Sequence, residues 1–204
     1  NKLKIEKIKK SHVAVFGVGG VGGYAAEALV RWRHSELGMI SPADFVPLFE
    51  RSGQISAVDR YVWRETAEQI AAWRDRYGVT LPVSVNLSRV DVFDPKLEKT
   101  LDEVLRQNDL TNDVFKLEVT ESAYTENAEQ LIRVINEMRA KGYEIEMDDF
   151  GSGYSSLNML SSLPIDALKL DMQFVRNAFR ERKDTRLLEV MILLAESFEL
   201  PTIA

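Results

Sequence analysis

The 204-residue chain has a net charge of −6, no cysteine and only two histidines, and 45% of its residues are hydrophobic. These numbers exclude disulfides and thiolate metal sites, and they make a histidine-rich zinc site or a Ser-His-Asp triad hard to build. The acidic balance argues against binding to nucleic acid polymers, and no apolar run approaches the ~20 residues needed for membrane insertion. We therefore expect a cytoplasmic globular domain in which any metal has oxygen ligands, which favours Mg²⁺, Mn²⁺ or Ca²⁺.

The segment "AVFGVGGVGGYAAEALVRWRH", residues 14–34, allows two incompatible structures. In the first, an apolar strand enters a glycine-rich turn that cradles a phosphate at the start of a helix. In the second, "AEALVRW" is a strand, and the two-residue alternation places Glu27, Leu29 and Arg31 on one face. The local pattern alone leaves both open.

Farther along the chain, apolar patterns of helical and strand spacing alternate regularly. Ser41 is the expected N-cap of the first helix, with Pro42 at its first position, and Gly78 and Gly142 are expected to end two later helices. The expected strands are 12–16, 25–31, 83–87, 115–119, 144–149, 167–171 and 202–204, and the expected helices are 41–53, 56–77, 95–108, 128–142, 155–163 and 182–198. This order predicts a parallel sheet covered by helices, either an open doubly wound sheet or a (β/α)₈ barrel.

Polar residues follow the apolar runs where successive predicted strands end, namely Asn86, Glu118, Asp148, Asp149 and Lys169. Because the carboxyl ends of parallel strands form one ligand-binding face, we expect these side chains to converge as oxygen ligands for divalent cations. Adjacent carboxylates at 148 and 149 would repel each other without nearby cations. A pair of metals suits attack at phosphorus, with Lys169 orienting or deprotonating the water.

Each of these residues also has a purely structural explanation. Asp149 and Gly151 fit a turn, with an aspartate cap and a positive φ at the glycine. Glu118 could be an ion-paired residue at a barrel end, Lys169 an extended surface lysine, and Asn86 a turn residue.

Six longer motifs show a family resemblance: "EALVRWRH", "GMISPADFVPLFERSG", "VSVNLS", "LEVTES", "DDFGSGYSSL" and "PIDALKLD". On these motifs, residues 26–204 resemble an EAL domain, the bacterial phosphodiesterase that opens cyclic di-GMP to linear pGpG in second-messenger signalling. The family is named for the tripeptide present here as Glu27-Ala28-Leu29. The resemblance implies a modified (β/α)₈ TIM-type barrel with a two-metal site for Mg²⁺ or Mn²⁺.

The resemblance also assigns roles to individual residues. It implies that one metal is held by Glu27, Asn86, Glu118 and Asp148, and that Asp148 and Asp149 bind a second. Lys169 would lie beside the attacking water, and Glu121 would steady the loop that begins at Asp149. Leu29 and Arg31 would contact cyclic di-GMP, with Arg31 near a phosphate.

Two departures from the family modify this expectation. Residues 11–31 also resemble the start of adenylyltransferases related to ubiquitin-activating enzymes. We therefore expect residues 1–25 to be a grafted segment and residues 26–204 to be an EAL domain. The sequence stops at Ala204, before a glutamate for the second metal, a glutamine beside the site and the last strand. We therefore expect an incomplete barrel of about seven strands, whose open edges favour a homodimer.

Three functions remain to be distinguished. The main expectation is a metal-dependent cyclic di-GMP phosphodiesterase. The alternatives are a catalytically impaired module that only binds cyclic di-GMP and, on the glycine turn alone, an ATP-binding protein related to adenylyltransferases.

Overall fold

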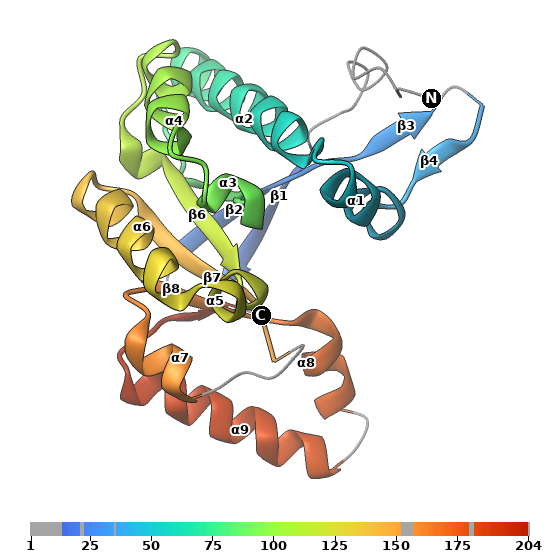
Figure 1. The fold of residues 1–204 in the computed structure, drawn as a ribbon, viewed down its shortest axis with the longest axis vertical. Helices are drawn as coiled ribbons and strands as arrows, with labels where there is room; N and C mark the ends of the chain where they lie inside the picture. The colour runs from blue at the N-terminus through green and yellow to red at the C-terminus, as the bar shows by residue number, and fades with distance from the viewer. Residues whose placement is uncertain (1–13, 21–22, 35, 152–156, 180–181, 204) are drawn as a thin grey trace. The chain divides into compact units, whose positions relative to one another are not determined.

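The computed structural model describes residues 14–20, 23–34, 36–151, 157–179 and 182–203 (Figure 1). Within it the chain divides into two compact units, Asn1–Phe115 and Lys116–Ala204. Strands alternate with helices in the second unit, as the hydrophobic spacing predicts, whereas the first unit begins with four strands in succession.

The strands of the first unit decide the structure of the glycine-rich segment. Strand β1 (Ala14–Gly20) runs antiparallel to β2 (Gly23–Leu29), which in turn runs parallel to β5 (Val83–Asn86). Glu27 therefore lies on a strand, as the second interpretation predicts, although this strand ends at Leu29. The phosphate-binding interpretation required a helix after the glycines and is wrong, because residues 23–29 are extended. The sheet is also not parallel throughout, since its first pair is antiparallel.

A short hairpin follows β2 and was not predicted. Strands β3 (Trp32–His34) and β4 (Gly38–Ile40) form a separate two-stranded sheet. Trp32 packs against Phe45 and Phe49, with ring centroids 5.7 Å apart in each pair. The expected strand 25–31 accordingly ends early, at Leu29, and leaves Arg31 outside it.

The helices of the first unit begin and end largely where local signals predict. Helix α1 (Pro42–Arg51) has Ser41 as its N-cap, and the Ser41 hydroxyl accepts a hydrogen bond from the amide of Ala43 at 3.3 Å. Helix α2 (Ile55–Tyr77) ends at Gly78, which has a φ of +65°. The remaining helices are α3 (Arg89–Val92), α4 (Leu97–Arg106) and the 3₁₀ turn η2 (Asn112–Val114). Helix α2 packs against α4 and β5 (Figure 1).

The second unit is a parallel sheet with helical connections. Its strands are β6 (Phe115–Thr120), β7 (Glu144–Phe150), β8 (Ala167–Leu170) and β9 (Thr202–Ile203), hydrogen-bonded in that order. Its helices are α5 (Glu121–Glu126), α6 (Ala128–Ala140), α7 (Leu157–Ser162), α8 (Met172–Ala178) and α9 (Arg182–Ser197). Parallel strands need such crossovers, because a tight hairpin can join only antiparallel ones.

Alternation along these strands separates an apolar from a charged face. Leu117, Val119, Ile145, Met147 and Leu168 share one face and are fully buried. The residues between them on β6, β7 and β8 include lysines and carboxylates. The charged face is therefore set by the two-residue period of each strand.

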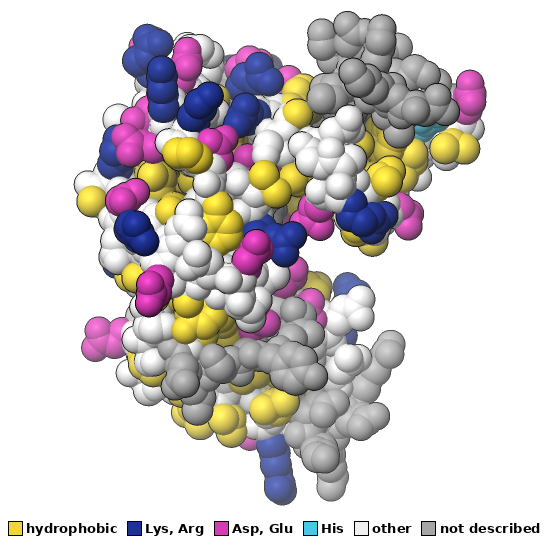
Figure 2. All heavy atoms as spheres, in the orientation of Figure 1, with side chains coloured by type: hydrophobic (Ala, Val, Ile, Leu, Met, Phe, Trp, Pro, Cys, Tyr) yellow, Lys and Arg dark blue, Asp and Glu magenta, His cyan; other side chains and the backbone are white. Residues whose placement is uncertain are grey.

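The surface carries both signs of charge. On the face drawn in Figure 2, Lys and Arg side chains are interspersed with Asp and Glu. Among the described helices, none is long and apolar enough to cross a membrane.

Candidate active site

The register of the second unit brings three predicted site residues onto one face. Glu118 of β6 is paired with Glu146 of β7, and Glu146 is paired with Ala167 of β8. Asp148 lies two residues beyond Glu146, and Lys169 lies two residues beyond Ala167. Since paired residues of parallel strands share a face and the period is two, Glu118, Asp148 and Lys169 face the same side.

The side chains of these three residues meet. The Lys169 ammonium donates a hydrogen bond to Oε1 of Glu118, and its Nζ lies 3.7 Å from Oδ1 of Asp148. Glu118 is fully buried, and the Lys169 and Asp148 side chains are 13% and 21% exposed. Lys169 is therefore not a surface lysine, whereas the ion-pair interpretation of Glu118 is confirmed. Two carboxylates converge on one cationic group, and their oxygen donors fit a hard divalent cation.

Asp149 is set apart from Asp148 by an irregularity in its strand. The register between β7 and β8 shifts between Met147 and Phe150, and Asp149 has a φ of +56°. A bulge of this kind breaks the regular two-residue alternation, so the direction of the Asp149 side chain does not follow from the strand period. Asp149 is exposed. Gly151 has a φ of +99°, as the turn interpretation predicts, so turn geometry and a candidate site occur together here.

Gly151 is also closely packed. A Cβ atom added to it would lie 3.2 Å from Cε of Met191 and 3.2 Å from Cγ of Phe174. Both the positive φ and this contact with α8 and α9 therefore favour glycine at this position.

Glu121 is the first residue of α5, directly after β6. The N-terminus of a helix carries a partial positive charge, which favours a carboxylate there. The contact expected between Glu121 and the loop after Asp149 involves residues 152–156, which lie outside the described residues.

In the first unit, Glu27 and Asn86 share a face. Glu27 of β2 is paired with Ser84 of β5, and Asn86, the last residue of β5, lies two residues farther on. The backbone carbonyl of Asn86 accepts a hydrogen bond from the indole Nε1 of Trp63 at 3.1 Å. Glu27 is partly exposed.

The two residues expected to contact the substrate, Leu29 and Arg31, differ in their position relative to β2. Leu29 ends β2 and is half-buried. Arg31 lies beyond the strand, and its guanidinium donates to the carbonyl of Val30 at 3.3 Å. The expectation that Glu27, Leu29 and Arg31 share one strand face is therefore wrong for Arg31, because the chain leaves β2 to begin the β3–β4 hairpin.

No group of three or more Asp, Glu or His side chains gathers into a metal-binding cluster within the part of the chain that the structure describes. The predicted ligands belong to both units: Glu27 and Asn86 to the first, Glu118, Asp148 and Asp149 to the second. The structure thus brings together Glu118, Asp148 and Lys169, and separately aligns Glu27 with Asn86.

A second ion-pair cluster on the same charged face was not predicted. Nζ of Lys116 lies 3.0 Å from Oε2 of Glu144 and 3.6 Å from Oε1 of Glu146. Burial lowers the pKa of Lys116, but hydrogen bonds and the charges of Glu144 and Glu146 outweigh this effect and leave its pKa raised. The signal was present in the sequence, since "FKLEV" and "YEIEMDDF" place charges at every second position.

Comparison with known proteins identifies the family. A model of the EAL domain matches residues 21–204. Cyclic di-GMP phosphodiesterase PdeR of Escherichia coli is 38% identical over 178 residues, which is 87% of this chain and 27% of that protein. Cyclic di-GMP phosphodiesterase PA2567 of Pseudomonas aeruginosa is 36% identical over 83% of this chain and 29% of its own length. The chain thus spans little more than a quarter of these curated relatives.

Solved structures show the same fold. The MucR phosphodiesterase in complex with c-di-GMP superposes with a TM-score of 0.87 and 29% identity, over 95% of this chain and 80% of that one. MucR is a bifunctional diguanylate cyclase and cyclic di-GMP phosphodiesterase of Pseudomonas aeruginosa. The EAL enzyme Bd1971, with cAMP and cyclic di-GMP bound, gives a TM-score of 0.89 at 25% identity, over 96% and 55% of the two chains. These matches confirm the predicted fold class, the TIM-type α/β architecture of EAL domains.

Proposed function

Because the chain belongs to the EAL domain family, we propose that it is a metal-dependent phosphodiesterase that hydrolyses cyclic di-GMP to linear pGpG. The observation that carries this proposal is the buried cluster in which Lys169 contacts both Glu118 and Asp148. A cationic amine held beside two carboxylates provides a water-orienting group next to oxygen ligands. The phosphodiesterases PdeR and PA2567 support the choice of substrate.

In this proposal, Glu27, Asn86, Glu118, Asp148 and Asp149 hold Mg²⁺ or Mn²⁺. When bound, such ions acidify water and neutralise charge that develops on phosphate oxygens. Five oxygen-donor side chains suit these hard cations.

The chain's other residues bind the dinucleotide and handle the water. Leu29 contacts the substrate, Arg31 neutralises a phosphate, and Glu121 holds the loop that follows Asp149. Lys169, oriented by Glu118, positions a water molecule in line with one phosphodiester bond. The water loses a proton as its oxygen forms a new bond to phosphorus, the bond from phosphorus to the 3′ oxygen breaks, and the 3′ oxygen takes up a proton. One water is thereby added in total.

Product analysis tests this function directly. The chain is incubated with cyclic di-GMP and Mg²⁺ or Mn²⁺, and pGpG is detected by chromatography. We expect pGpG with the parent chain, and a loss of at least about 100-fold with Glu118→Gln, which removes a ligand charge at nearly constant volume. Glu129→Gln, in the first turn of α6, is the matched control and should retain parental turnover.

The other outcomes identify the alternatives. Metal-dependent binding of cyclic di-GMP without pGpG would leave only a binding module and contradict the catalytic proposal. Binding by Glu118→Gln equal to that of the parent would contradict the role of Glu118 as a metal ligand.

A further inference from the structure

One face of helix α2 holds the backbone segment that carries Asn86. Trp63 binds the carbonyl of Asn86, and Arg60 binds Asp94, which lies beyond helix α3. On this basis we propose that Trp63 is a positioning residue that orients Asn86 for metal binding. The inference rests on the proposed function, because it takes Asn86 as a ligand.

The bond from Trp63 is well placed for this role. The Trp63 side chain is 1% exposed, and its Nε1 lies 3.1 Å from the carbonyl oxygen of Asn86. Asn86 is two residues beyond Ser84, where the pairing of β5 with β2 ends. The indole therefore fixes the peptide group at the point where the Asn86 side chain leaves the strand. Groups that orient a ligand in this way commonly change metal affinity by about 10–100-fold.

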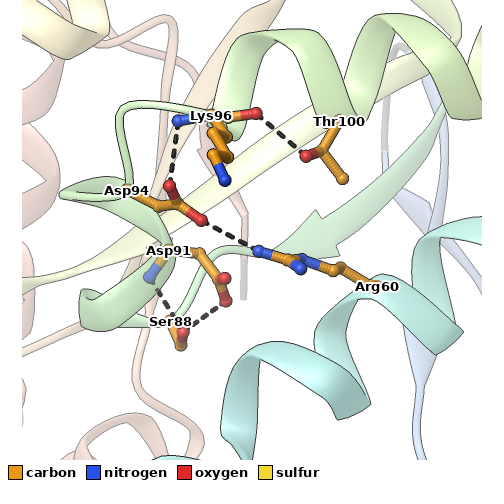
Figure 3. A network of polar contacts seen from close by, with 6 residues as sticks. All are labelled: Arg60, Ser88, Asp91, Asp94, Lys96 and Thr100. Carbon is orange, nitrogen blue, oxygen red and sulfur yellow. Dashed lines mark hydrogen bonds and ion pairs between the residues drawn. The ribbon is translucent and has the colours of Figure 1, made fainter.

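The chain from Ser88 to Thr100, which follows β5, is held by a polar network, drawn in Figure 3. Ser88 caps α3: its hydroxyl donates to Oδ2 of Asp91 at 2.5 Å and accepts from the Asp91 amide at 3.3 Å. Nη2 of Arg60 donates to Oδ2 of Asp94 at 2.8 Å. Helix α2 thus contacts the chain on both sides of α3, through Trp63 at Asn86 and through Arg60 at Asp94.

Trp32 provides a matched control within the same unit. Its side chain is 6% exposed and packs on Phe45 and Phe49. Unlike Trp63, its Nε1 has no hydrogen-bond partner among the described residues. The same change at the two tryptophans therefore removes a buried indole N–H group in each case, but only the N–H of Trp63 binds the Asn86 carbonyl.

The experiment replaces Trp63 by 3-benzothienylalanine, which keeps the shape of the bicyclic ring but has sulfur in place of the N–H group. Mn²⁺ affinity is measured from the electron paramagnetic resonance signal of the free ion. We expect about tenfold weaker Mn²⁺ binding, with an unchanged far-ultraviolet circular dichroism spectrum. The same replacement of Trp32 should change the affinity less than about twofold.

Combination with Asn86→Ala separates positioning from general packing. If Trp63 acts through Asn86, its replacement has no further effect on Mn²⁺ affinity once the Asn86 side chain is gone. Equal losses in both backgrounds, or no loss in the parent background, would overturn the inference and leave the proposed function standing. Failure of the parent to bind Mn²⁺ would overturn both. Parental binding by Asn86→Ala would remove Asn86 from the ligand set and overturn the inference alone.

Discussion

At the level of single residues, the charged face of the second unit contains buried charged side chains, each stabilised by an ion-pair partner of opposite charge. Glu118 is fully buried and accepts a hydrogen bond from Lys169. Removing one partner of a buried ion pair leaves the other charge poorly solvated, which costs about 3–5 kcal/mol. The Glu118–Lys169 pair therefore contributes to stability as well as to the proposed chemistry.

The first prediction concerns Lys169→Met. In the presence of a metal chelator, this variant should lose about 3 kcal/mol of unfolding free energy, because the buried carboxylate of Glu118 loses its cation. Urea denaturation measures the loss, and Lys99→Met, at an exposed lysine of α4, should change stability by less than about 0.5 kcal/mol. A stability loss of the same size in both variants would contradict the pairing.

Asp59 gives a prediction about pH. Burial and the neighbouring carboxyl of Asp91 raise the pKa of Asp59 well above its ordinary value of about 3.9. The folded protein therefore keeps this proton to higher pH than the unfolded chain does. The contribution of this proton to the free energy of unfolding is present at low pH and is lost as pH rises from about 4 through the raised pKa of Asp59.

Asp59→Asn removes the titration and keeps the shape of the side chain. We expect it to be more stable than the parent near pH 8, with the difference shrinking toward about pH 5. Urea unfolding at several pH values measures this difference. Asp113→Asn, at an exposed position, should follow the parent, and a constant difference across pH would contradict the raised pKa.

At the level of helices and strands, prediction succeeded where the signal is local. The caps at Ser41 and Gly78 define their helices because a side-chain oxygen or a positive φ is needed at that residue. Short elements such as α3 and α5 were missed, since one or two turns leave too few residues to show a period. The antiparallel pairing of β1 was also missed, because alternation reveals a strand but not its direction.

Asp166 connects three elements of the second unit and supports a further prediction. Its carboxylate accepts bonds from Arg139 of α6 at 2.7 and 3.2 Å and from the amide of Ile145 at the start of β7 at 2.8 Å. Asp166→Ala should cost about 2 kcal/mol, because it removes a charged acceptor from a backbone amide as well as an ion pair.

Arg139→Gln is the comparison for that variant. It should cost less than about 1 kcal/mol, because the Arg139 side chain is 41% exposed and water replaces its partner. Chemical denaturation of the two variants measures both values, and equal losses would show that the bond to Ile145 contributes nothing.

At the scale of the whole molecule, the sequence predicted which polar residues lie near the carboxyl ends of the strands but not how each side chain is directed. Glu118, Asp148 and Lys169 were predicted to converge and do so, because parallel strands share one carboxyl edge. The bulge at Asp149 and the departure of Arg31 from β2 depend on strand register and on the β3–β4 hairpin. Both are set by pairing between segments far apart in the sequence, which a local pattern does not contain.

The net charge of −6 leads to the last prediction, which concerns how an anionic ligand binds. A cyclic dinucleotide carries two phosphate charges, and the candidate site adds the carboxylates of Glu118 and Asp148. Without divalent cations, the like charges of site and ligand oppose binding; bound cations reverse the charge of the site, so that it attracts the phosphates.

Calorimetric titration with cyclic di-GMP should give at least about tenfold weaker affinity in chelator than in Ca²⁺, a cation that also takes oxygen ligands. Added monovalent salt should weaken binding in Ca²⁺ and leave it unchanged or improve it in chelator, because screening acts on attraction in the first case and on repulsion in the second. Equal affinities in the two conditions, with the same salt dependence, would mean that Arg31 and other cationic side chains bind the phosphates without metal.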